Sequence, residues 1–365
     1  MTGGPLAGLK VLEFVGIGPG PHCAMLLADL GADVLRIDRP GGNGWTNPVS
    51  DRGRAVLPLD LRTEAGRAKS LELIARADVL IEGNRPGVME RIGLGPDVAC
   101  ALNERLIYAR MTGWGQDGPL ATAAGHDINY IALTGALAAI GKPGEPAVVP
   151  LNLVGDFGGG SLFLAFGIMS ALWEREKSGM GQVVDAAIID GVASMMSLFT
   201  GVPTSKGISI DRGTNVLSGS APFYRCYLCK DGKEVSVGAL EPQFYAELLA
   251  RVGAPANWVE DQYDTSNWPE RSAWFAMQFL SKPRDEWTAL IEGSDACFAP
   301  VLDLYEAVQH PQMQSRGTYV ERDGLIHHAP APRFSRTQAS IPEGRDADAM
   351  LADWTFGKLS TAFLT

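Results

Sequence analysis

The stretch Leu9-Lys-Val-Leu-Glu-Phe-Val-Gly-Ile-Gly-Pro-Gly-Pro21 is a short apolar run followed directly by a turn of glycines and prolines. An apolar run of this length suits a buried strand of a parallel sheet. A helical pattern follows over residues 24–28 and ends at Gly31, and residues 32–37 form a second apolar run. This order of strand, turn, helix and strand predicts a Rossmann-like unit at the start of the fold.

The same turn argues against a nicotinamide cofactor. The dinucleotide-binding fingerprint is G-x-G-x-x-G, whereas this turn is G-x-G-x-G with Pro19 and Pro21 inside it. Each proline removes a backbone N–H that a phosphate-binding loop would use. The turn therefore predicts the fold without predicting this cofactor.

Strand and helix patterns continue to alternate along the chain. Residues 55–61, 78–82, 106–111 and 182–187 are predicted strands, and residues 63–77 are a predicted helix. Strands that alternate with helices through short loops form parallel sheets with helices on both faces. The sequence therefore predicts an α/β fold.

After residue 221 the pattern changes, because residues 222–229 and 234–238 alternate like a hairpin around the turn Asp231-Gly232. Helical patterns follow this hairpin. We therefore predict two domains joined by two linkers. They are a large Rossmann-like domain of residues 1–199 and 330–365, a linker of residues 200–221, a smaller α+β domain of residues 222–320 and a return linker of residues 321–329.

The composition limits the possible partners. Hydrophobic residues make up 46 % of the chain, and the formal net charge at pH 7 is −11. A negative protein repels nucleic acid and anionic membrane surfaces. The best candidate for a membrane span, residues 161–173, is too short, and we find no signal peptide in residues 1–10. We expect a cytoplasmic protein that binds no nucleic acid and has no stable membrane association.

The five cysteines are scattered, which is typical of reduced thiols inside cells. Cys226 and Cys229 have the spacing of a metal or redox pair, but no second Cys or His pair follows at metal-binding spacing. We therefore predict no metal site.

Four arginines fall at or just beyond the ends of predicted strands: Arg39, Arg62, Arg85 and Arg91. Ligands of open parallel sheets bind at the carboxyl ends of the strands, and guanidinium groups match phosphate oxygens. In an acidic protein these arginines predict a phosphate-binding site. The alternative is that they are ordinary surface residues.

The stretch Gly125-His-Asp-Ile-Asn-Tyr130 begins a predicted helix that continues over residues 131–140. A histidine is the side chain best suited to move protons near neutral pH, and His126 stands beside a carboxylate. The alternative is a plain helix start in which Asp127 caps the helix.

Asp156 precedes three glycines and a helix predicted from residue 162, and Glu241 precedes a helix that starts at Pro242. Asp156 is either an N-cap, which would have a lowered pKa, or a carboxylate that the glycines leave open to a substrate. A histidine and a carboxylate on opposite sides of one carbon would suit removal and return of a proton. Removal of a proton beside a carbonyl group leaves an enolate, and backbone N–H groups at helix N-termini would donate hydrogen bonds to its oxygen.

Over nearly its whole length the chain resembles the α-methylacyl-CoA racemase branch of the family III CoA-transferase superfamily. The resemblance rests on Gly16-Ile-Gly-Pro-Gly-Pro21, Arg36-Ile-Asp-Arg-Pro40, Leu106-Ile-Tyr-Ala-Arg-Met-Thr-Gly-Trp-Gly-Gln116, Gly125-His-Asp-Ile-Asn-Tyr130, Pro150-Leu-Asn-Leu-Val-Gly-Asp-Phe-Gly-Gly159 and Glu241-Pro-Gln-Phe-Tyr245. The strings that begin at Gly125 and Glu241 are the ones specific to the racemases.

The resemblance implies a 1,1-proton transfer at C2 of a 2-methylacyl-CoA thioester. His126 and Asp156 would act on opposite faces, Glu241 would orient His126, and the backbone amide of Asp127 would lie near the thioester oxygen. The residues implied to bind coenzyme A are Arg39, Leu59, Asp60, Leu61, Arg62, Gly83, Asn84, Arg85, Arg91, Gly125 and Tyr130. Coenzyme A is part of the substrate, so no cofactor and no metal are implied.

The resemblance also implies an interlocked homodimer, with crossing segments near residues 200–220 and 320–335 and with Glu241 acting in the partner's site.

Two other functions stay open. In a CoA-transferase Asp156 would attack as a nucleophile and form a mixed anhydride, but such an enzyme has no need of His126. The chain could also bind acyl-CoA without catalysis. The sequence leaves the acyl group open among branched fatty acyl, sterol side-chain and aryl-propionyl groups.

Overall fold

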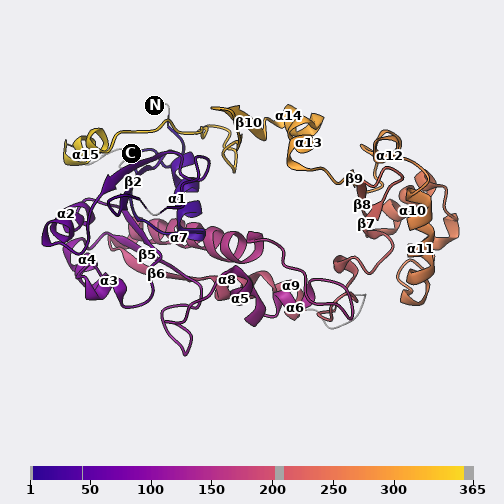
Figure 1. The fold of residues 1–365 in the computed structure, drawn as a ribbon, viewed down its shortest axis with the longest axis horizontal. Helices are drawn as coiled ribbons and strands as arrows, with labels where there is room; N and C mark the ends of the chain where they lie inside the picture. The colour runs from indigo at the N-terminus through magenta and orange to yellow at the C-terminus, as the bar shows by residue number, and fades with distance from the viewer. Residues whose placement is uncertain (1–2, 43, 202–208, 357–365) are drawn as a thin grey trace. The chain divides into compact units, whose positions relative to one another are not determined.

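The computed structural model describes residues 3–42, 44–201 and 209–356, which form two compact units (Figure 1). Among the described residues, the first unit comprises residues 3–42, 44–134, 151–195 and 317–356, and the second comprises residues 135–150, 196–201 and 209–316. Part of the predicted linker, residues 202–208, lies outside the described residues.

A six-stranded parallel sheet forms the centre of the first unit and confirms the predicted α/β fold. Its strand order is β3-β2-β1-β4-β5-β6, the order of a Rossmann sheet. The strands are β1 (Lys10–Phe14), β2 (Asp33–Asp38), β3 (Arg54–Pro58), β4 (Val79–Glu82), β5 (Ile107–Thr112) and β6 (Gln182–Ala187). The strand order reverses between β1 and β4, so a crevice for ligands is expected at the carboxyl ends of these strands.

Helices cover this sheet. A core of buried side chains, which includes Leu12, Leu73 and Tyr108, also takes in Met350 and Trp354 of the C-terminal helix α15 (Ala347–Phe356). The other helices of the unit are α1 (Pro19–Asp29), α2 (Glu64–Ile74), α3 (Val88–Arg91), α4 (Pro96–Leu102), α5 (Asp127–Leu133), the π-helix η1 (Leu153–Ser161), α7 (Leu162–Ser178) and α8 (Ile188–Met195). A hairpin of β10 (Tyr319–Arg322) and β11 (Leu325–His328) completes the unit.

One sequence prediction about helices near the candidate site is wrong, and another is incomplete. The helix predicted over residues 131–140 breaks at Gly135, whose φ of 85° is left-handed, so α5 ends and the short helix α6 (Ala136–Ala139) begins. The helix predicted from residue 162 is confirmed as α7, but the π-helix η1 that runs directly into it was not predicted. Asp156 therefore lies inside a helical segment and is not an N-cap.

The second unit contains a three-stranded antiparallel sheet of β7 (Tyr224–Leu228), β8 (Glu234–Gly238) and β9 (Phe298–Pro300). Tyr224 pairs with Gly238, which confirms the predicted hairpin, whereas the third strand was not predicted. Its helices are α9 (Ser197–Gly201), α10 (Pro242–Val252), α11 (Trp268–Phe279), α12 (Arg284–Ile291), α13 (Leu304–Gln309) and α14 (Pro311–Arg316), with 3₁₀ turns at Val216–Ser218, Ala256–Val259 and Thr265–Asn267.

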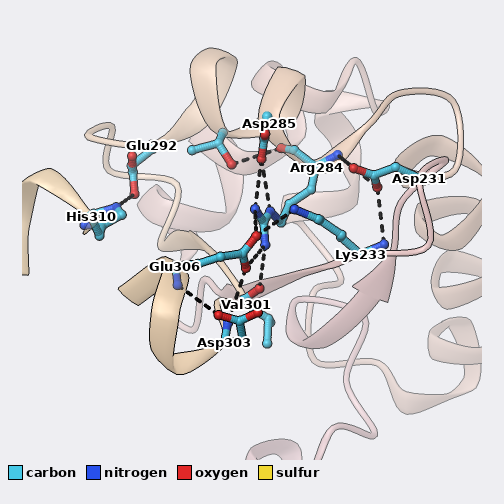
Figure 2. A network of polar contacts seen from close by, with 10 residues as sticks. Asp231, Lys233, Arg284, Asp285, Glu292, Val301, Asp303, Glu306 and His310 are labelled. Carbon is cyan, nitrogen blue, oxygen red and sulfur yellow. Dashed lines mark hydrogen bonds and ion pairs between the residues drawn. The ribbon is translucent and has the colours of Figure 1, made fainter. Parts of the chain in front are cut away.

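A polar network on the second unit joins the turn just before β8 to α12 and α13 (Figure 2). The guanidinium of Arg284 donates to both carboxylate oxygens of Glu306, at 2.7 and 2.9 Å, and the ammonium of Lys233 donates to the same carboxylate at 2.6 Å. These hydrogen bonds hold the pKa of Glu306 well below its ordinary value. Because none of the predicted site residues takes part, we assign this network a structural role.

Candidate functional site

His126 is the N-cap of α5, and its imidazole is exposed. The side chain of Asn129 accepts a hydrogen bond from the backbone N–H of His126 at 3.0 Å, and the backbone N–H of Asn129 donates to the His126 carbonyl at 2.8 Å. These two bonds fix the first turn of the helix through the backbone of His126 and through the side chain and backbone of Asn129. The His126 imidazole is therefore exposed at the start of a helical turn that the His126 backbone and Asn129 hold in place.

The loop before His126 is shaped by Tyr130. A Cβ atom on Gly113 would come within 2.0 Å of the Tyr130 ring and one on Gly125 within 2.7 Å, so neither position accepts a side chain without a shift. The Tyr130 hydroxyl donates to the Gly125 carbonyl, and Trp114 packs edge-on against the ring at 4.7 Å between centroids. The structure thus gives Gly125 and Tyr130 a packing role that fixes the position of His126.

Asp156 lies within η1, with its carboxyl group directed at the start of α1. A Cβ atom on Gly18, the N-cap of α1, would be 3.1 Å from Oδ2 of Asp156. The side chain of Asn152 donates to the same oxygen at 3.4 Å. Burial raises the pKa of the Asp156 carboxyl above its ordinary value. The bond from Asn152 lowers it, the charge of Asp127 raises it further, and a charge on His126 lowers it.

Asp127 connects the two candidate acid–base residues. Its Oδ2 accepts a hydrogen bond from the backbone N–H of Asp156 at 2.7 Å. A Cβ atom on Gly155 would be 2.3 Å from the same oxygen, so this approach requires glycine. The sequence predicted a role for the backbone amide of Asp127. The structure adds a role for its buried carboxylate, which ties the segment after His126 to the segment that carries Asp156.

Apart from Gly125 and Tyr130, the residues predicted to bind coenzyme A follow β2, β3 and β4 at the carboxyl edge of the sheet. Arg39 comes directly after β2 and donates from Nε to the Gly42 carbonyl at 2.7 Å. After β3, Leu59 and Leu61 pack against the core, while Arg62 pairs with Asp60 at 2.9 Å and lowers its pKa to about 2. Gly83, Asn84 and Arg85 follow β4, and Arg91 lies in α3. The four arginine side chains are exposed, as an anion-binding set requires.

Sequence reasoning missed a buried pair that shapes the loop after β4. Glu82 is fully buried at the end of this strand and accepts the backbone N–H of Asn84 at 2.7 Å and Nε of Arg110 at 2.9 Å. Burial raises the pKa of Glu82, and these two bonds oppose the shift. In a sequence, a charged residue at the end of an apolar run indicates the start of a loop. The pattern therefore did not predict the buried pair of Glu82 and Arg110.

Glu241 is the N-cap of α10 in the second unit, with Pro242 in the first turn. Its contact with His126 stays a prediction. Within the described residues no group of three or more His, Cys, Asp or Glu side chains could hold a metal ion. Cys226 and Cys229, on and just after β7, are both free thiols.

The chain is similar to known proteins in both its sequence and its fold. A model of CoA-transferase family III matches residues 6–345. Alpha-methylacyl-CoA racemases of Mus musculus and Homo sapiens are each 43 % identical to this chain, and each match covers 93 % of this chain and 89 % of the relative. Among solved structures, a CAIB/BAIF family protein from Brucella suis has a TM-score of 0.80 at 26 % identity, over 96 % of this chain and 100 % of that one.

Proposed function

Since this chain belongs to CoA-transferase family III, we propose that it is a racemase that interconverts (2R)- and (2S)-2-methylacyl-CoA thioesters. The observation that carries this proposal is the linkage of His126 to Asp156 through the carboxylate of Asp127. It ties the residue after His126 to the backbone of Asp156, whose partly buried carboxyl group has a raised pKa that a charge on His126 lowers. The similarity to racemases over most of both chains supports the same activity.

In the proposed mechanism one of the two groups removes the C2 proton and the other returns a proton to the opposite face. A carboxyl group with a raised pKa serves this purpose, because it is protonated in a larger fraction of molecules near neutral pH than a free aspartate. One proton is exchanged between substrate and the two groups, so one group must be unprotonated when the other carries a proton. The backbone amide of Asp127, in the first turn of α5, is proposed to stabilise the enolate oxygen.

The remaining predicted residues are proposed to hold the substrate. Coenzyme A carries phosphate groups, and the exposed arginines that follow β2, β3 and β4 are suited to bind them. Glu241 is proposed to orient His126 from the partner chain. Coenzyme A is part of the substrate, and the proposed proton transfer uses no metal, flavin or nicotinamide.

The nearest alternative is transfer of coenzyme A between acids, in which the Asp156 carboxylate attacks the thioester. Incubation with a 2-methylacyl-CoA in heavy water separates the two. We expect deuterium to enter C2 without any acceptor acid, since proton exchange at C2 is the proposed reaction. An Asp156→Asn variant is the matched control and should not support racemisation. A strict requirement for an acceptor acid, with trapping of an acyl-enzyme by hydroxylamine, would show transfer instead.

We also propose that the protein forms the interlocked homodimer implied by its family. Along α7 the side chains of Leu162, Phe166, Met169 and Trp173 follow one helical face and are exposed, Phe166 by 71 % and Trp173 by 68 %. The run Leu153–Ser178 also has the length and apolar composition to cross a membrane, although 33 % of its most apolar window is buried inside the protein. A second copy of the chain is the proposed cover for this face.

The dimer proposal predicts the result of sedimentation equilibrium. At micromolar concentration the wild-type protein should sediment at twice the mass of the chain. A Phe166→Glu and Trp173→Glu double variant should dissociate, because two carboxylates would be buried without partners. The control is Glu176→Ala, near the end of the same helix, which should not change the mass. A wild-type monomer, or binding to neutral lipid vesicles that the double variant abolishes, would contradict the proposal.

A further inference from the structure

A histidine that the proposed mechanism does not use supports the segment that carries Asp156. His22 lies in the first turns of α1, and its Nδ1 is 2.6 Å from the hydroxyl of Ser161, the last residue of η1. Its ring stacks on Phe157, the residue after Asp156, with 4.3 Å between ring centroids and an interplanar angle of 26°. His22 therefore contacts η1 both next to Asp156 and at its end.

The π-helix needs such contacts because its own sequence does not favour a helix. Residues 158–160 are all glycine, the poorest helix former after proline. Packing requires glycine here: a Cβ atom on Gly159 would lie 2.5 Å from the side chain of Val192, and one on Gly191 would lie 1.9 Å from the Gly159 carbonyl. Long π-helices are rare, and most occur as single turns at functional sites. Contacts with other parts of the chain therefore decide whether η1 keeps its form.

The form of η1 decides where the Asp156 side chain points. A π-helix holds more residues per turn than an α-helix, and one residue of an α-helix turns the chain by about 100°. Relaxation of η1 to an α-helix would rotate the carboxyl group away from Gly18, against which it now lies. The hydrogen bond to Ser161 and the stack on Phe157 both oppose that rotation.

We propose that His22 is a positioning residue for Asp156, which it holds against the start of α1 by anchoring η1 through Phe157 and Ser161. The surroundings of His22 suit a fixed, neutral support. Burial, and after it the positive charges of His328, Arg54 and Arg52, lower the pKa of His22 to about 4. The inference rests on the proposed role of Asp156 and adds a residue that touches no substrate.

Three variants test this proposal. Ser161→Ala removes the hydrogen bond, His22→Phe also removes it but keeps an aromatic ring, and His22→Asn removes the stack. We expect kcat for racemisation to fall about tenfold in Ser161→Ala and further in His22→Asn, with KM changed by less than about twofold. Adding His22→Phe to Ser161→Ala should lower kcat little further, because both remove the same bond. The matched control is Leu73→Val, in a core cluster that contains no η1 residue.

A second measurement separates positioning from general loss of stability. If η1 relaxes, Asp156 becomes better hydrated and its raised pKa should fall toward the ordinary value. The acid limb of the pH–rate profile should then move to lower pH in His22→Asn, but not in Leu73→Val. An unchanged kcat and pH profile in the folded His22 and Ser161 variants, or equal losses in Leu73→Val, would overturn the proposal. If the wild-type protein shows no exchange at C2, the proposed function fails. Carboxyl NMR titration of Asp156 still tests His22 in that case.

Discussion

Replacement of His126 by alanine is expected to lower the rate of racemisation by about 10²–10⁴-fold, the usual contribution of a general acid or base. The loss should appear in both directions, because each direction needs one group to remove the proton and the other to return it. Binding of coenzyme A should change by less than about threefold, since the proposed phosphate contacts lie after β2, β3 and β4. Circular dichroism of each enantiomer gives the rates, and calorimetry gives the affinity.

The fold should survive this substitution. The first turn of α5 is held by hydrogen bonds that use the backbone of His126 and the side chain of Asn129, and alanine keeps both backbone groups. A large loss of activity would therefore report on chemistry. We expect the melting temperature to stay within a few degrees of the wild type, because the imidazole is exposed and alanine keeps the backbone groups of this N-cap position.

Separate enantiomers give this prediction its sharpest control. In heavy water His126→Ala should lose C2 exchange chiefly from the enantiomer that His126 deprotonates, whereas Asp156→Asn should lose it chiefly from the other. Each variant should lose exchange from a different enantiomer, because the two bases lie on opposite faces of the same carbon. Equal losses from both enantiomers in both variants would contradict the two-base arrangement, as would racemisation within tenfold of wild type in His126→Ala.

Much of the first unit could be predicted because its strands are continuous apolar runs. The run that contains Val11 and Leu12 is fully buried in β1, and the next run became β2 in parallel register with it. Arg39, Arg62 and Arg85 were placed correctly just after strand ends for the same reason, whereas Arg91 lies in α3. Periodicity marks buried strands and their ends, and the fold brings these ends to one edge of the sheet.

The details of the site could not be predicted, because they depend on contacts between distant segments. An N-cap was one of the two roles that the sequence left open for Asp156, since an acidic residue before glycines and an apolar run has that pattern. Only the packing of η1 against α1 and α8 makes it part of a π-helix. The carboxylate of Asp127 and the ring of His22 contact residues 29 and 139 positions away, and no local pattern records such contacts.

Glu13 is another residue whose role the pattern concealed, because it lies within the apolar run of β1 and is fully buried. Its carboxylate accepts Nε of Arg54 at 2.6 Å and Nε of Arg36 at 3.2 Å. Arg54 also donates to the carbonyl groups of Ser50 and Pro21, so this network holds the residue that precedes His22. The Arg54 side chain is itself fully buried. Glu13 therefore supplies the main negative charge beside a cation that water does not reach.

Glu13→Ala is expected to lower the free energy of unfolding by about 3–5 kcal/mol, the range for removal of one partner of a buried ion pair. Urea unfolding should show a lower midpoint with an unchanged slope, since the surface exposed on unfolding stays nearly the same. The matched control is Glu176→Ala, which removes the partner of Arg105 from a pair whose side chains are both about half exposed. That loss should stay below about 1 kcal/mol.

The isosteric variant Glu13→Gln identifies the cause of the loss. Glutamine keeps the volume and one acceptor oxygen of Glu13 but not its charge. Arg36 and Arg54 therefore keep their packing but lose the negative charge that balances their positive charges. If the uncompensated cations cause the instability, Glu13→Gln should lose most of what Glu13→Ala loses, because burial of an unpaired charge is the largest penalty in this network. If glutamine restores wild-type stability, the cavity left by alanine is the cause. The buried charge would then have no part in holding the start of α1.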